Sequence, residues 1–299
     1  MSFAWAPGTL EVYGSGLLIF HVFCDGRGIP ERSTLDNYYY GVRAWHILHN
    51  IPWLIEQAAI DALLKAATTL APQSSKRKKR LPYTVEVLII ILHHLDLTCP
   101  LDAAVWSCLT TVFLFRCAGG GVHSANAGLV RPCYPCHPFE YATDRHNLTQ
   151  TAFFILRTKS AQAHGEDAFW SRQDGPTDPE SALNNHFAVN NPLPTSPLFS
   201  YLHKNSLRPL TKSAFLKRLH VAFSAAQIEP LQGHGIRIGS TLEYLLRGVP
   251  FDVVKSMGRW ASESFTVYLR KHAQIMAPYM QADSALQAAF FHRTMPPVR

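Results

Sequence analysis

The chain has 299 residues, 47% of them hydrophobic, which is typical of an ordinary globular protein and excludes wholesale disorder. Lys and Arg number 28 against 21 Asp and Glu, so the net charge is +7, an excess that is compatible with a polyanionic partner but does not require one. The first 20 residues lack a basic stretch followed by an apolar core, and the longest apolar run, within 85–92, is too short to cross a bilayer, so we expect neither secretion nor membrane insertion.

Apolar residues recur at helical spacing over much of the first 70 residues, in three sets within 10–21, 38–48 and 60–64. We therefore predict a small helical N-terminal domain over residues 1–72. A polar, basic, Pro-bounded run at 73–82 then predicts an interdomain linker. Its charges come from Lys76, Arg77, Lys78, Lys79 and Arg80.

Helical spacing returns at 85–115 and again from about 199 to 292, with a short helix predicted at 179–187 inside a loop rich in Pro, Asp and Asn. Residues 152–156 have the composition of a strand and lead into a turn. Segment 117–150 is rich in Gly, Pro, Cys and His and has no sustained period, so we expect irregular loop there. The predicted class is mainly α with a few β-strands, and the second domain covers 83–299.

Six cysteines in a chain without a secretion signal are expected to be reduced thiols of a nuclear or cytoplasmic protein. Cys133 and Cys136 form a C-x-x-C pair with histidines nearby, which superficially suggests zinc or haem. A second ligand pair at the spacing of a zinc finger is missing. We therefore predict no metal and no cofactor.

The most informative stretch is 231–272, where His234, Arg237, Trp260 and Tyr268 follow in order. His234 and Arg237 are three apart and share a helix face. This stretch resembles the C-terminal half of the tyrosine recombinase (phage integrase-like) catalytic domain. It is most similar to fungal DNA breaking-rejoining enzymes of mobile elements, in which G-H-x-x-R-I-G-x-T, R-G-V-P-x-D-V-V-K and G-R-W recur together. The resemblance covers most of the chain.

The resemblance implies roles for five residues. Tyr268 would attack the scissile phosphate and form a 3′-phosphotyrosyl bond, without ATP or metal. Arg237 would clamp two phosphate oxygens, His234 would transfer a proton or bind a phosphate oxygen, and Trp260 would donate its indole N–H. Lys159, on a β-hairpin turn, would protonate the leaving 5′-oxygen.

Each of these residues also has a structural interpretation. Tyr268 could be a core aromatic, His234 a helix-capping residue, Arg237 a surface helix arginine and Trp260 a hydrophobic lid. Lys159 could be a solvated loop lysine, and Arg157 competes with it for the hairpin role. Tyr268 follows Trp260 by eight residues, whereas many bacterial and phage relatives have nine. Tyr244 and Tyr279 do not fall at the right distance after Gly-Arg-Trp and are predicted to be packing residues.

Two departures from the family pattern affect the predicted activity. Ala118 falls where the family carries its first catalytic arginine in A-R-x-G-E, and Arg116 lies on the opposite side of a helix. Codons can be chosen for 115–132 that, read one nucleotide later, encode S-A-A-R-V-G-E-F-T-V-R-T-L-D-S-F-D-P. We interpret 117–150 as a stretch read out of frame or across a misplaced splice site. The N-terminal domain also lacks about one helix between Pro30 and Ser33, so the implied DNA clamp is shortened.

The sequence thus predicts a DNA-binding protein of the tyrosine recombinase fold that acts in DNA recombination or integration and is impaired by the missing arginine. Its expected partners are double-stranded DNA and further copies of itself on DNA. The basic run 76–80 could be a solvated linker, a contact with DNA phosphates or a nuclear import signal, and the family resemblance implies that DNA contact and import both apply. One alternative is a catalytically inactive DNA-binding remnant of a mobile element. Another is a helical interaction module without a nucleic-acid role.

Overall fold

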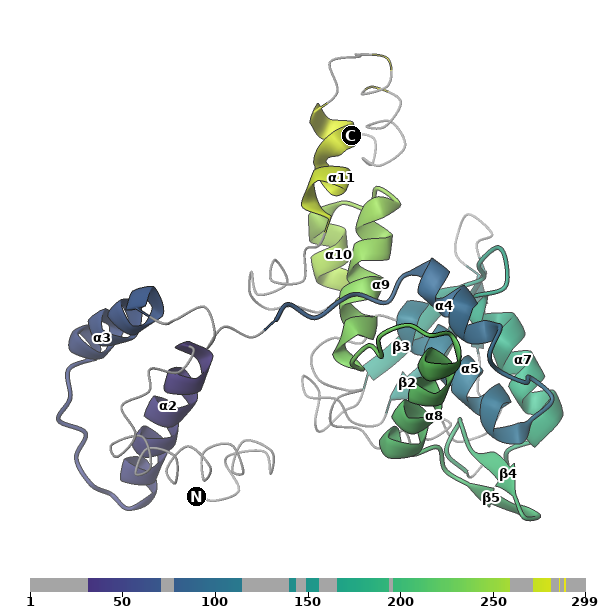
Figure 1. The fold of residues 1–299 in the computed structure, drawn as a ribbon, viewed down its shortest axis with the longest axis horizontal. Helices are drawn as coiled ribbons and strands as arrows, with labels where there is room; N and C mark the ends of the chain where they lie inside the picture. Colours follow the sequence, from purple (N-terminus) through teal and green to yellow (C-terminus); the bar gives the residue numbers. More distant parts are fainter. Residues whose placement is uncertain are drawn as a thin grey trace. The chain divides into compact units, whose positions relative to one another are not determined.

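A computed structural model gives the fold (Figure 1). It describes residues 32–70, 78–114, 140–143, 149–155, 166–193, 196–258, 271–280 and the positions 285 and 288. Most of these residues are helical and the strands form two small sheets, so the predicted mainly α class is confirmed. The chain divides into two compact units, Met1–Lys79 and Arg80–Arg299, and the division falls within the predicted 73–82 linker.

The first unit contains helices α2 (Arg32–Leu48) and α3 (Gln57–Leu70), which match the predicted sets at 38–48 and 60–64. An aromatic cluster holds the chain where it turns between them. The ring of Tyr39 meets Trp53 edge to face at 5.6 Å, and its hydroxyl donates to Gln57 Oε1 at 2.8 Å. The predicted helix within 10–21 lies outside the described residues.

The core of the second unit is built around one buried helix, α5 (Pro100–Leu114), whose residues from Asp102 to Leu114 are buried with the exception of Val112. Most of its side chains are apolar or small, as expected of a helix that is surrounded by other elements, although Asp102 and three hydroxyl residues are buried with them. Three helices pack against it (Figure 1), namely α7 (Pro179–Asn190), α8 (Lys212–Ala225) and α9 (His234–Leu246), and so does the short strand Tyr201–His203.

The predicted helical stretch 85–115 is two helices rather than one, because α4 (Val85–Leu92) ends before a turn at 93–99. Thr84 caps the start of α4 by accepting a hydrogen bond from the Val87 N–H. Pro100 begins α5, a position that proline favours because its missing N–H would have no helical partner. Between them, Asp96 accepts bonds from the backbone N–H and the hydroxyl of Thr98, which closes the turn.

Three strands form an antiparallel sheet in the order β1 (Glu140–Thr143), β2 (Thr149–Ile155) and β3 (Glu166–Ser171). The predicted strand within 152–156 is therefore confirmed. The expectation of irregular structure over 117–150 was wrong at 140–143 and 149–150. Residues 140–143 have no apolar period of their own. They form β1 by pairing with β2, whose first two residues are 149 and 150, and Tyr141 lies opposite Thr151.

A second hairpin, β4 (Tyr201–His203) and β5 (Ser206–Arg208), lies in a region predicted to be helical. Its two turn residues, Lys204 and Asn205, have φ angles of 49° and 59°, as a type I′ hairpin turn requires. A strand of three residues is too short to show the alternation of apolar and polar side chains that predicts a strand. In the sequence, only Asn205, a residue type common in such turns, indicated the hairpin.

Among the described residues after α9 are α10 (Phe251–Met257), α11 (His272–Met276) and a 3-10 turn, η5 (Ala277–Met280). Val254 and Ile275 pack on the C-terminal half of α9, while Ile236 in its first half belongs to the main core. Helix α9 therefore connects the main core to the C-terminal helices. In the described part of the chain, every helix is too short or too polar to cross a membrane.

Candidate active site

Helix α9 places two of the predicted site residues on its first turn. His234 is its first residue and Arg237 its fourth, and both are half-buried. The intervening Gly235 and Ile236 are buried, as is Ile238. The residues between and just after them are thus packed in the core, while His234 and Arg237 remain partly exposed on the same turn. The helix that a spacing of three presupposes is present, and the roles of the two side chains remain a prediction.

Two glycines of the same motif allow the chain after the linker to cross α9 in backbone contact (Figure 1). A Cβ at Gly235 would lie 2.5 Å from the Leu81 carbonyl oxygen, and one at Gly239 would lie 1.8 Å from the Tyr83 carbonyl oxygen. Neither space could hold a methyl group. The Tyr83 N–H donates to the Gly235 carbonyl at 3.0 Å, so this crossing is also hydrogen-bonded.

Two backbone N–H groups at the start of α9 already donate hydrogen bonds to carbonyl groups of the turn that begins the helix. Gly235 N–H donates to the Gln232 carbonyl at 2.8 Å, and Ile236 N–H donates to the Gly233 carbonyl at 3.2 Å. An anion at this end would therefore be bound through side chains, aided by the helix dipole. The first turn of α9 contains no acidic residue that would oppose an anion there.

The predicted hairpin for Lys159 is present as β2 and β3. Their last pair is Ile155 with Glu166, so Lys159 falls in the connection 156–165, outside the described residues. A hydrogen bond connects the residue that follows α9 to the chain just after β3. In it, Arg247 Nη1 donates to Gln173 Oε1 at 2.6 Å. Arg247 also pairs with Glu243 one turn earlier, at 2.8 Å.

The end of α5 is also attached to α9. The Tyr244 hydroxyl donates to the Leu114 carbonyl at 2.8 Å, which satisfies one of the free carbonyls at the C-terminal end of α5. Tyr244 thus has a structural role, as its distance from Gly-Arg-Trp predicted. Ala118, where the family resemblance implies an arginine, comes four residues after Leu114 and lies outside the described residues.

Lys271 follows Tyr268 by three residues, and its positive charge acts on Glu86 in the first turn of α4. The pKa of Glu86 is lowered, chiefly by a hydrogen bond with Thr84 and also by the charge of Lys271. Trp260 and Tyr268 themselves lie outside the described residues, and so do Lys76 and Arg77. Lys78, Lys79 and Arg80 are exposed.

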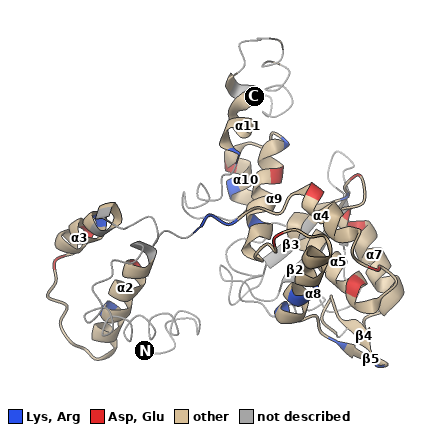
Figure 2. Ribbon diagram, viewed as in Figure 1, with Lys and Arg blue, Asp and Glu red and all other residues tan. Residues whose placement is uncertain are grey.

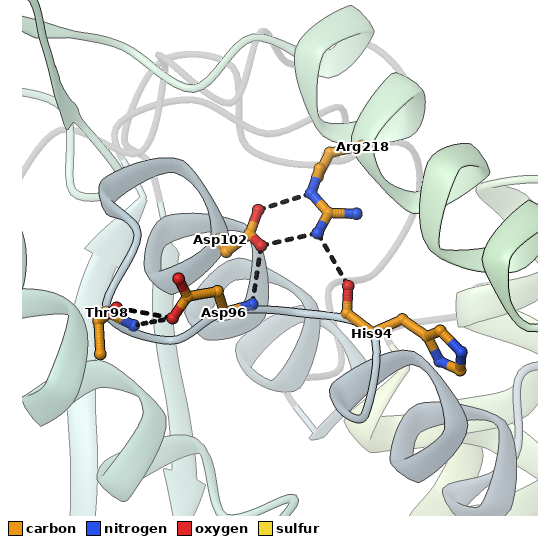
Figure 3. Close-up of polar contacts among 5 residues, drawn as sticks. All are labelled: His94, Asp96, Thr98, Asp102 and Arg218. Carbon is orange, nitrogen blue, oxygen red and sulfur yellow. Dashed lines mark hydrogen bonds and ion pairs between the residues drawn. The ribbon is translucent and has the colours of Figure 1, made fainter.

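Sequence reasoning missed an ion pair that fixes α8 (Figure 3). Arg218 donates through Nε and Nη2 to the two oxygens of Asp102, at 2.6 and 2.7 Å, and through Nη2 to the His94 carbonyl at 2.8 Å. Asp102 also accepts from the Asp96 N–H at 2.9 Å. The two partners are 116 positions apart, and no spacing rule could have paired them.

The possible metal ligands Cys133 and Cys136 lie outside the described residues. Among the residues that the structure does describe, no three His, Cys, Asp or Glu side chains gather as a metal site would need.

Comparison with protein-family models gives no match, and comparison with curated proteins gives none either. Among solved structures, the chain matches the crystal structure of XerA recombinase with a TM-score of 0.41 and 11% sequence identity. The match covers 99% of this chain and 95% of that one. At this score and identity the match does not place the chain in a family.

Proposed function

We propose that the chain is a DNA-binding protein of the tyrosine recombinase type, whose strand cleavage is weakened by the loss of one arginine. The observation that carries the proposal is the presentation of His234 and Arg237 on the first turn of α9, with Trp260 and Tyr268 following in the order of the resemblance. Helix α9 also receives the base of the β2–β3 hairpin and the end of α5, the two elements that lead to Lys159 and Ala118.

The proposed reaction exchanges one phosphate ester for another. The Tyr268 phenol oxygen attacks the phosphorus, a bond to that oxygen forms and the bond to the 5′-oxygen breaks. The phenol proton passes to a base, for which His234 is the candidate, and Lys159 gives a proton to the leaving 5′-oxygen. Arg237 and Trp260 hold the non-bridging oxygens while negative charge builds on them. The ester bond energy is retained in the protein–DNA link.

Lys and Arg residues on β4–β5 and α8, drawn in blue in Figure 2, support DNA as the substrate. From Ser181 to Ile228 the sequence contains no Asp or Glu. Arg218 within this stretch is neutralised by Asp102, but the other basic residues of β4–β5 and α8 are exposed. They are Lys204, Arg208, Lys212 and Lys217. Exposed positive charges bind phosphates without reading sequence, and the affinity that they provide falls steeply with salt.

The DNA-binding part is tested by measuring duplex affinity against salt concentration. Replacing Lys204 and Lys217 by Gln should reduce the slope of log affinity on log salt by about 1.8, since each phosphate contact contributes about 0.9. Arg172→Gln is the matched control, because Arg172 is equally exposed but lies outside the acid-free stretch. Salt-independent or absent duplex binding would favour the helical interaction module instead.

A second candidate function is a catalytically inactive DNA-binding remnant of a mobile element, which the alanine at position 118 favours. A nicked duplex distinguishes the active enzyme from the inactive remnant. After cleavage the short leaving strand diffuses away, so an active enzyme remains covalently attached to the DNA, whereas an inactive protein forms no covalent link. Tyr244→Phe is the matched control for the tyrosine, since Tyr244 makes a structural bond. An adduct that survives Tyr268→Phe would contradict the assignment of the nucleophile.

Further parts of the proposal concern cellular context. We propose that copies of the chain associate on DNA, and that residues 76–80 direct nuclear import as well as contacting DNA. Fusion of a fluorescent protein to the intact chain and to a variant with these five residues changed to Gln tests the import role. The variant should lose nuclear enrichment, and equal enrichment of both would refute an import role.

A further inference from the structure

Tyr83 contacts three separate parts of the second unit. Its ring is fully buried and meets Phe223 of α8 edge to face, with centroids 5.8 Å apart. Its hydroxyl donates to the Leu231 carbonyl at 3.2 Å, in the loop before α9, and its backbone N–H donates to Gly235 within α9. One residue therefore joins α8, the loop that leads to His234 and the first turn that carries Arg237.

The segment Leu81–Tyr83 is hydrogen-bonded to α9, and its position along the helix is also fixed. The Leu81 carbonyl occupies the space above Gly235, and the Tyr83 carbonyl occupies the space above Gly239, one turn further along. A shift of the segment along the helix would bring these carbonyls against side chains. Arg80, which immediately precedes Leu81 and is exposed, is thereby held close to the turn that carries His234 and Arg237.

We propose that Tyr83 is a positioning residue for the α9 site: it fixes where the basic linker crosses α9, so that Arg80 and Arg237 are presented to the same duplex in a fixed register. This inference rests on the proposed DNA-binding function. Arg80 should contribute to DNA affinity only while Leu81 and Tyr83 keep their contacts with Gly235 and Gly239.

The anchoring is tested without DNA by the rate of tryptic cleavage after Arg80. A protease must extend the residues on both sides of the bond, so seating of Leu81–Tyr83 on α9 should protect it. Gly239→Ala places a methyl group where the Tyr83 carbonyl lies and should speed cleavage at this bond at least tenfold. Gly233→Ala is the matched control, since its Cβ would meet only the end of the Leu216 side chain, at 3.2 Å. Equal rates in both variants would overturn the anchoring.

The positioning role is tested by a double-mutant cycle on duplex binding. Arg80→Gln should reduce the salt slope by about 0.9 in the wild-type background. In the Gly239→Ala background it should have little effect, because Arg80 is no longer held beside α9. A purely structural role for Gly239 would leave the effect of Arg80→Gln equal in both backgrounds, and that result would overturn the proposal.

Tyr83→Phe provides a milder variant should Gly239→Ala fail to fold, because it removes only the bond to Leu231. It should weaken the effect of Arg80→Gln partially, and an undiminished effect counts against the proposal. If the proposed DNA-binding function is wrong, the two experiments give a different combination of results. In that case neither background binds duplex in a salt-dependent way, while tryptic protection of Arg80 still responds to Gly239→Ala.

Discussion

Replacing Arg218 by Met should strongly destabilise the second unit. The Asp102 side chain is buried, with 4% of the residue exposed, and its carboxylate accepts two bonds from Arg218 and one from Asp96 N–H. The substitution retains most of the aliphatic stem but leaves a buried carboxylate with a single donor. Removing one partner of a buried ion pair costs about 3–5 kcal/mol. The Arg218 side chain is 18% exposed, so we expect the lower end, about 3 kcal/mol.

Urea unfolding followed by far-UV circular dichroism measures this loss as a lower midpoint at an unchanged m value. Glu243→Gln is the matched control, because it breaks an exposed i,i+4 pair with Arg247, worth about 0.3–0.5 kcal/mol. Combining Arg218→Met with Asp102→Leu should recover part of the loss. The remaining cost is then that of the unpaired Asp96 N–H and His94 carbonyl, about 1–3 kcal/mol.

A loss for Arg218→Met no larger than that for Glu243→Gln would refute the reasoning. It would mean that the ion pair does not fix α8 against the turn before α5. The position of α8, which carries the exposed Lys217, would then need another explanation.

Three further predictions concern stability and activity. Burial lowers the pKa of His186 to about 4, below its unfolded value of about 6.5, so its contribution to stability is complete above pH 6.5 and is lost as the pH falls toward 4. Wild type should therefore lose about 2 kcal/mol more than His186→Gln between pH 7 and 5 in urea unfolding. Asp178→Ala should cost about 2 kcal/mol by the same measurement, because Asp178 caps α7 through two backbone amides. Restoring the in-frame arginine stretch over 115–132, with arginine at position 118, should raise the rate of phosphotyrosyl adduct formation about 10²–10³-fold, and an unchanged rate would show that another group replaces this arginine.

The parts of the fold that the sequence predicted well are those set by local periodicity. The helices at α2, α3 and α7, and the strand within 152–156, follow from spacing and composition. The break at 93–99 was missed because the apolar period continues through it. It is made by Asp96 and Pro100, which act through hydrogen bonding and a missing N–H rather than through hydrophobicity.

The same distinction applies to the candidate site. His234 and Arg237 could be placed together because a spacing of three fixes their relative direction on any helix. The role of Gly235 and Gly239 could not be predicted, because it depends on the backbone of Leu81–Tyr83 from the other end of the unit. The convergence of Trp260 and Tyr268 on Arg237 likewise depends on tertiary packing, and it remains a prediction.

The most direct test of the central claim is to map the residue that becomes covalently attached to DNA. The chain with its in-frame arginine stretch restored is incubated with a nicked suicide duplex, digested and examined by peptide mass spectrometry. We predict a single nucleotide-bearing peptide that contains Tyr268, and its complete loss in Tyr268→Phe. A restored chain that binds duplex but forms no adduct, or an adduct on Tyr244 or Tyr279, would contradict the account.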